Sequence, residues 1–159
     1  MGRVLLIDNE IKSTDEIKKI LLALDPQCAI ETYDSLEQFE KDASAGSPEF
    51  FKFNLIIIEY QLAKFNEWET KIADLRTKVP AETVICFTSY DAPGVNRKHI
   101  LNLAVFNLIY KPYDPLILKE NLNMALKTSE NLKEQIKPLE MKAQPSTAYV
   151  GILKEVDIL

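Results

Sequence analysis

Charged and polar residues with the chemistry to bind a ligand stand at the ends of four apolar runs of this sequence. They are, in chain order, Asp8, Asn9 and Glu10; Glu59; Thr88 and Ser89; and Lys111 with Pro112. Carboxylates bind hard cations, whereas a hydroxyl and an ammonium donate to negatively charged oxygens. If the four runs are neighbouring strands of one parallel sheet, these groups converge at its carboxyl edge, where such sheets bind ligands.

The order of the predicted elements supports such a sheet. Apolar runs predict strands at residues 3–8, 28–33, 53–60, 83–88 and 105–110, and the run at 53–60 is typical of a strand covered on both faces. Amphipathic segments predict helices at residues 13–24, 35–43, 67–78, 95–103 and 115–137. Five such βα units predict an α/β fold with a doubly wound, five-stranded parallel sheet and an extended C-terminal helix.

Local signals predict where several helices begin and end. Ser13 and Ser35 are each followed three residues later by Glu or Gln, the spacing of a capping box, so both are predicted N-caps. Asp114, followed by a proline, is the predicted N-cap of the last helix. Pro138 is expected to end that helix near Lys137 because proline cannot continue its hydrogen-bond pattern.

Composition excludes several classes of function. The 159 residues are 47% hydrophobic and carry a formal net charge of −5, which indicates one domain with a full core and no basic surface for nucleic acid or for an anionic membrane. No apolar segment is long enough to span a bilayer, so we expect a cytoplasmic protein. Cys28 and Cys86 lie in apolar runs and are predicted to be buried free thiols. Glu10 is expected to be a solvated surface acid, and His99 a packing residue.

Four segments, in this order and spacing, carry a resemblance to a known family. They are "VLLIDNE", "NLIIIEYQLAKFNEWE", "VICFTSYD" and "LIYKPYDP". Over about residues 2–127 the chain resembles the receiver domain of bacterial two-component response regulators, which implies the flavodoxin-like strand order 2-1-3-4-5. In that family an acidic pair after the first strand and an Asp ending the third hold Mg²⁺, and that Asp accepts a phosphoryl group from a histidine kinase.

The resemblance implies a role for each of several positions. Glu59 stands at the phosphoacceptor position, and Leu108 stands where an aromatic residue rotates inward on activation. The acidic-pocket or metal positions are Asp8, Asn9 and Gln61, and the phosphoryl-contact positions are Thr88, Lys111 and Pro112, the last expected in the cis form.

Two of the three metal carboxylates are altered, which leads to our preferred hypothesis. Asn9 is a neutral amide, and the extra methylene of Glu59 moves its carboxylate outward by about 1.5 Å. Mg²⁺ sites depend on clustered negative charge, and phosphoryl transfer loses heavily from a misplacement of about 1 Å. We therefore expect a pseudo-receiver, a non-catalytic interaction module without a cofactor, in which Glu59 pairs with Lys111 and partly mimics a phosphoryl charge.

Two alternatives remain open for the same residues. The chain could be a working receiver that uses Mg²⁺ and an atypical acceptor, or Glu59 and Lys111 could form an ion pair that is only structural. Further departures from the family pattern are Ala63, Glu67 and Ala104, which replace a proline and two glycines.

The C-terminal part of the sequence suggests how the domain contacts partners. We divide the chain into a receiver-like domain at 1–127, a helix extension and linker at 128–147, and a tail at 148–159 that is the possible start of a further domain. An a/d pattern runs through Leu118, Leu122, Ala125, Ser129, Leu132, Ile136 and Leu139. It predicts a parallel homodimer in which Leu122, Ala125, Leu132 and Ile136 face the second copy. The other expected partner is a separate protein or an attached output domain.

Overall fold

A five-stranded parallel sheet forms the centre of the protein. The computed structural model describes residues 2–142, with only the backbone described for residues 138–142. The strands are β1 (Arg3–Ile7), β2 (Ala29–Tyr33), β3 (Leu55–Glu59), β4 (Val84–Tyr90) and β5 (Asn107–Lys111). All the pairs are parallel, and the strand order is β2-β1-β3-β4-β5. The predicted fold class and strand order are confirmed.

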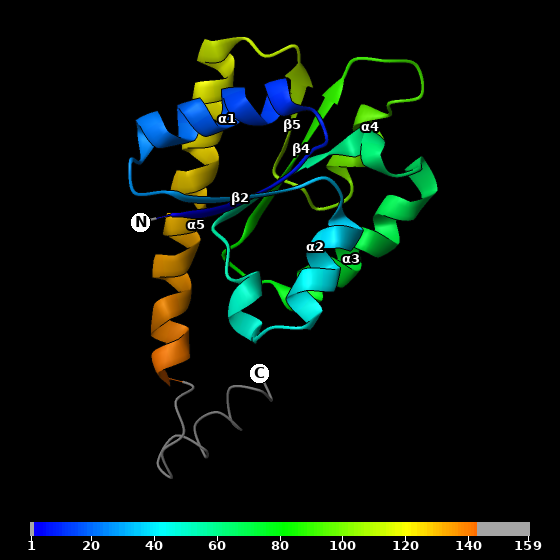
Figure 1. Ribbon diagram of the computed structural model, residues 1–159. Coiled ribbons are helices and arrows are strands. Elements are labelled where there is room, and N and C mark those ends of the chain that lie inside the picture. The colour runs from blue at the N-terminus through cyan, green and yellow to red at the C-terminus, as the bar shows by residue number, and fades with distance from the viewer. Residues whose placement is uncertain (1, 143–159) are drawn as a thin grey trace.

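Helices cover both faces of this sheet (Figure 1). They are α1 (Ile11–Leu24), α2 (Leu36–Ser44), α3 (Trp68–Lys78), α4 (Arg97–Leu101) and α5 (Pro115–Lys142), with short 3₁₀ helices η1 (Pro48–Phe51), η2 (Tyr60–Leu62) and η3 (Phe65–Glu67). In Figure 1, α1 and α5 lie on one face, and α2, α3 and α4 lie on the other. Among the described residues, no helix combines the length and the apolar character needed to cross a bilayer.

Two hydrophobic cores follow from the alternation of side chains along each strand. Val4 and Leu6 of β1 point toward α1 and α5, and they pack there with Leu21 and Leu122. The intervening strand residues pack with α2, α3 and α4. That second core contains the buried aromatic residues Phe39, Trp68 and Phe87. Cys28 and Cys86 are buried free thiols, as predicted.

Two of the three predicted N-caps are confirmed. The Ser35 side chain accepts a hydrogen bond from the Gln38 backbone N–H (3.1 Å), and Asp114 accepts from the first turn of α5. The Ser13 prediction is wrong, because α1 begins at Ile11 and Ser13 lies inside its first turn. The Ser13 hydroxyl is instead buried and 2.7 Å from the hydroxyl of Tyr113.

The last helix is longer than predicted, because it continues through Pro138 to Lys142. Pro138 has no N–H to donate to the carbonyl of Glu134, but Glu134 and its neighbours are exposed, so water can satisfy that carbonyl. Figure 1 shows this part of α5 projecting past the edge of the sheet. The linker at 143–147 and the tail at 148–159 lie outside the described residues.

The structure also corrects the residues predicted for a dimer helix. Leu122 and Ala125 are fully buried in the core beneath α5, so neither can face a second copy in this fold. Ser129 is fully buried as well, which shows that the domain covers one more turn of α5 than expected. Leu132 and Ile136 are half-buried and are the remaining apolar positions of the pattern with described side chains.

Candidate functional site

The alternation of side chains brings the predicted site residues to one face of the sheet. Asp8 follows Leu6 by two residues, Glu59 follows Ile57, Thr88 follows Cys86 and Lys111 follows Ile109, and each of these apolar residues packs on the α1–α5 side. The four polar side chains therefore continue the rows of that core to the carboxyl edge of the sheet. They are all buried, with 1–6% of each residue exposed. The convergence predicted from the strand ends is present for these four residues, but not for Asn9, which is exposed, or for Ser89.

Lys111 lies at the centre of this cluster. Its Nζ is 2.8 Å from Asp8 Oδ2 and 2.6 Å from Glu59 Oε2. Burial by itself lowers the pKa of the Lys111 ammonium, but the hydrogen bonds and charges of Asp8 and Glu59 outweigh it, and the pKa is raised above the ordinary value of 10.5. The ammonium is therefore held in its charged form between two carboxylates.

The remaining carboxylate oxygens of the cluster also have partners. Asp8 Oδ1 accepts from the Glu10 backbone N–H (2.9 Å), and Glu59 Oε1 accepts from the Gln61 backbone N–H (3.2 Å). Glu59 Oε2 accepts a second, longer bond from the Thr88 hydroxyl (3.4 Å). Each oxygen of the two buried carboxylates is thus engaged within the protein.

This donor set does not fit a Mg²⁺ site as it is arranged. Mg²⁺ requires near-octahedral oxygen ligation at about 2.0–2.1 Å. Here the Lys111 ammonium occupies the space between Asp8 and Glu59, while Asn9 and the Gln61 side chain are exposed. In residues 2–142, no group of three or more His, Cys, Asp or Glu side chains is placed to hold a metal ion. A cation bound between Asp8 and Glu59 would have to displace Lys111.

Glu10 and Tyr90 close over the cluster, and no pattern in the sequence indicated that Tyr90 would lie there. The Tyr90 hydroxyl donates to the Glu10 carboxylate, with distances of 2.8 and 2.7 Å to its two oxygens. Glu10 Oε2 also lies 3.7 Å from Lys111 Nζ, and the ammonium is 5.3 Å from the centre of the Tyr90 ring. The hydrogen bond to Glu10 raises the pKa of the Tyr90 phenol. Glu10 is therefore part of the site, not the solvated surface acid we predicted.

The other predicted positions lie as follows. The Lys111–Pro112 peptide bond is cis, as the resemblance implied. Leu108 is buried in the core under α3 and α4, on the opposite face of the sheet from the charged cluster. Its side chain therefore has no direct access to Lys111 or Glu59. Ser89 also points away from the cluster, and its hydroxyl donates to the Tyr90 carbonyl.

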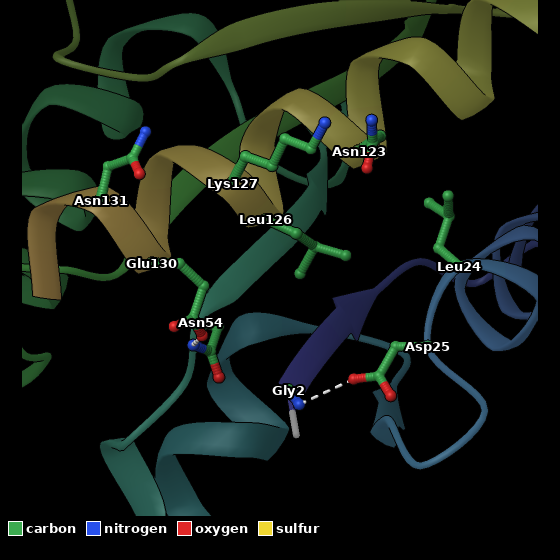
Figure 2. A pocket seen from close by; sticks show the side chains of 9 residues that line it. All are labelled: Gly2, Leu24, Asp25, Asn54, Asn123, Leu126, Lys127, Glu130 and Asn131. Carbon is green, nitrogen blue, oxygen red and sulfur yellow. Dashed lines mark hydrogen bonds between the residues drawn. The ribbon is translucent and has the colours of Figure 1, made fainter. Parts of the chain in front are cut away.

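A hollow of about 380 Å³ lies at the opposite edge of the sheet, beside α5 (Figure 2). Asp25 accepts from the Gly2 backbone N–H there (2.9 Å), and Glu130 extends from α5 toward the Asn54 amide (3.4 Å). The carboxylates of Asp25 and Glu130 thus hold the start of β1 and the segment before β3 in place. They do not form a cluster comparable to that around Lys111.

Comparisons with known proteins place the fold. No family model matches the chain, and no curated protein matches it. Among solved structures, a receiver domain of a two-component histidine kinase from Clostridium thermocellum aligns with a TM-score of 0.65 and 23% identity, over 79% of this chain and 98% of that one. A response regulator receiver protein from Burkholderia phymatum aligns with a TM-score of 0.63 and 18% identity, over 80% and 96% of the two chains. The chain has the receiver fold.

A larger protein shares this fold over part of its length. NtrX from Brucella abortus, in complex with ADP, aligns with a TM-score of 0.63 and 18% identity, over 98% of this chain but 34% of the NtrX chain. These identities are low, so the roles of individual residues rest on the geometry of this receiver fold and not on the alignments.

Proposed function

We propose that this chain is a pseudo-receiver, a two-component signalling module that contacts a protein partner or an attached output domain and is not switched by phosphorylation. The observation that carries the proposal is the Lys111 ammonium, 2.6–2.8 Å from both Asp8 and Glu59. This bridge supplies from within the chain the charge pair that phosphorylation would otherwise create. A cytoplasmic location fits this role.

The chemistry of Glu59 supports the proposal. A nucleophilic carboxylate needs an oxygen with a free lone pair aimed at phosphorus, in line with the leaving group. Oε2 of Glu59 is bound by Lys111 and Thr88, and Oε1 is bound by the Gln61 N–H. Both lone pairs of Oε2 are thus engaged, while Oε1 accepts a single bond. Attack by Oε1 would take place beside a buried ion pair and without the Mg²⁺ that normally compensates the approaching phosphate charge.

The test is incubation of the full chain with acetyl phosphate and Mg²⁺, followed by intact-mass measurement. We expect no gain of a phosphoryl group in the wild type, and little in Glu59→Asp, because Asn9 still lacks the acid. The double variant Glu59→Asp/Asn9→Asp is the matched control, since it restores both acids of the pattern. Efficient labelling of the wild type at Glu59 or Asp8 would establish the alternative, a working receiver with an atypical acceptor.

We also propose a homodimer contact on the projecting part of α5. Leu132 and Ile136 lie one turn apart and remain partly exposed beyond the last buried turn. Exposed apolar side chains at this spacing are typical of a helix that packs on a partner. A further partner is an attached output domain. In its support, the matched region makes up only 34% of the NtrX chain.

Sedimentation equilibrium tests this contact. The full chain should associate at high micromolar concentration, and Leu132→Lys/Ile136→Lys should be monomeric. The control Asn131→Lys/Gln135→Lys adds the same charge at two exposed positions of the same turns and should leave association unchanged. A dimer that survives the Leu132/Ile136 variant would remove this surface as the interface.

A further inference from the structure

The short helix α4 lies between the two described residues that have a positive φ. Gly94 precedes it with φ 89°, and Ala104 follows it with φ 58°. The helix itself has five residues, and a helix of this length is marginal unless contacts with the rest of the fold support it. The α4 segment, residues 95–103, therefore depends on a few side-chain contacts.

Two side chains of α4 hold this segment against the domain. Ile100 is fully buried in the core that also contains Leu103 and Leu108. The His99 ring packs on the Phe65 ring of η3, with 3.9 Å between the ring centres. The other three residues of α4 are exposed. One buried aliphatic residue and one ring contact thus fix the helix.

The packed position of His99 leaves one of its nitrogens unsatisfied. His99 Nε2 is buried and has no hydrogen-bond partner among residues 2–137. Nδ1 lies 3.9 Å from Glu69 Oε1, which is too long for a hydrogen bond, and the Glu69 side chain is 74% exposed. Burying a polar atom without a partner costs free energy, because the atom loses the hydrogen bond that water would provide. His99 Nε2 therefore opposes the packed position of α4, whereas Ile100 and the Phe65 ring favour it.

We propose that the α4 segment is a hinged flap, which is closed when His99 packs on Phe65 and opens by rotation at Gly94 and Ala104. Gly94 rotates at little cost, because it has no side chain and nothing lies within 4 Å of the place where a Cβ would stand. Ala104 leaves a disfavoured left-handed conformation when it rotates. In the open position water reaches Nε2, which offsets part of the lost contact with Phe65. The open flap is therefore a minor state of the folded protein.

The position of the flap determines the apolar surface on this side of the protein. Phe65 and Leu101 are 46% and 45% exposed, and opening separates the Phe65 ring from His99. This change of surface requires no phosphoryl group and no change in the cluster around Lys111. It therefore goes beyond the proposed pseudo-receiver function and does not depend on it.

Native-state hydrogen exchange of the full chain, followed by NMR, measures the opening. The amides of Ile100 and Leu103 report on the flap, since they donate to the carbonyls of Asn96 (3.0 Å) and Ile100 (3.1 Å) within the segment. The amide of Ile57 in the central strand β3 reports on global unfolding. At low urea concentration, the two flap amides should exchange at least about tenfold faster than Ile57 and with little dependence on urea. Equal rates with equal urea dependence would show that α4 opens only when the whole domain unfolds, and would overturn the proposal.

Two variants should change the opening in opposite directions. Phe65→Ala removes the ring on which His99 packs, so the two flap amides should exchange at least about fivefold faster. His99→Phe keeps an aromatic ring on Phe65 and removes the unsatisfied nitrogen, so the same amides should exchange at least about fivefold more slowly. Because Phe65 is largely exposed, its variant retains the fold and tests the flap even if a phenylalanine does not fit at position 99.

Phe50→Ala is the matched control. Phe50 is also a partly exposed phenylalanine of a short 3₁₀ helix, but it packs beside Gly46, so its variant should leave the flap amides unchanged. Flap amides that stay within about twofold of the wild type in Phe65→Ala would overturn the proposal, as would faster exchange in a folded His99→Phe variant. None of these measurements uses a phosphodonor, so the flap and the absence of phosphorylation are tested separately.

Discussion

Replacing Lys111 by Met should destabilise the domain by about 3–5 kcal/mol, because it leaves Asp8 and Glu59 as buried carboxylates without a cation. At 2.6–2.8 Å, each contact contributes about 6 kcal/mol of attraction at an effective dielectric constant near 20, before desolvation is subtracted. Desolvation of each ion removes several kcal/mol of that attraction. The expected loss is a large part of the 5–15 kcal/mol that typically holds a domain folded.

Urea denaturation followed by the fluorescence of Trp68, a fully buried residue, measures this loss directly. The variant Lys111→Met/Asp8→Asn/Glu59→Gln should recover most of the stability, because it removes the unpaired charges together with the cation. Its recovery would show that the single variant fails through buried charge and not through lost packing.

Lys78→Met is the matched control for burial. Lys78 lies 2.8 Å from Asp74 and 3.8 Å from Glu40, so it also contacts two carboxylates, but its side chain is 38% exposed against 2% for Lys111. Such a surface pair contributes about 0–1 kcal/mol. If Lys111→Met cost no more than Lys78→Met, the cluster would be a solvated ion pair and our account of the site would be refuted.

Further predictions concern other parts of the fold. The pKa of Lys111 is raised above its unfolded value of 10.5, so the contribution of its charge to the stability of the folded domain is complete below pH 10.5 and is lost as the pH rises through the folded-state pKa. In urea denaturation between about pH 9 and 11.5, the wild type should therefore lose stability faster than the Lys111→Met/Asp8→Asn/Glu59→Gln variant. Ala104 has φ 58°, a left-handed conformation that disfavours a Cβ, so Ala104→Gly should stabilise the domain by about 0.5–1 kcal/mol in the same assay. Ser35→Ala should destabilise it by about 1 kcal/mol through the lost cap of α2, whereas Ser47→Ala, where the hydroxyl makes no cap bond, should not. Burial raises the pKa of Cys86 to about 12, so iodoacetamide should modify it only in urea, as mass spectrometry of digested protein can measure.

The sequence predicted those features that depend on local pattern and on the topology of a parallel sheet. The strand ends at Asp8, Glu59 and Lys111 could be assigned to one edge because each ends an apolar run, and parallel strands place such ends together. The same reasoning predicted that Glu59 reaches Lys111. Capping at Ser35 was predictable because the bond spans three residues.

Contacts between distant segments could not be predicted in this way. Ser13 has capping-box spacing, but its hydroxyl binds Tyr113, and no local pattern distinguishes the two outcomes. Glu10 looks like any acid in a loop, and its partner Tyr90 is eighty residues away. The predicted length of the buried part of α5 was too short because Ser129 is small and polar, so its sequence does not mark it as a core position. It can be buried because its hydroxyl accepts a hydrogen bond from the Asn54 amide.

The length of α5 has a mechanical consequence. Its 28 residues span about 42 Å, and the 13 residues beyond Ser129, the last fully buried position, span about 20 Å. The 15 residues from Pro115 to Ser129, about 22 Å, are held against the sheet, and the remaining 13 residues project beyond it. A bend of about 10° just beyond Ser129 would leave Leu118 and Leu122 where they are and would move the far end by about 3–4 Å. A small change of angle beside Ser129 would thus move Lys142, the last described residue of α5, by several ångströms relative to the sheet.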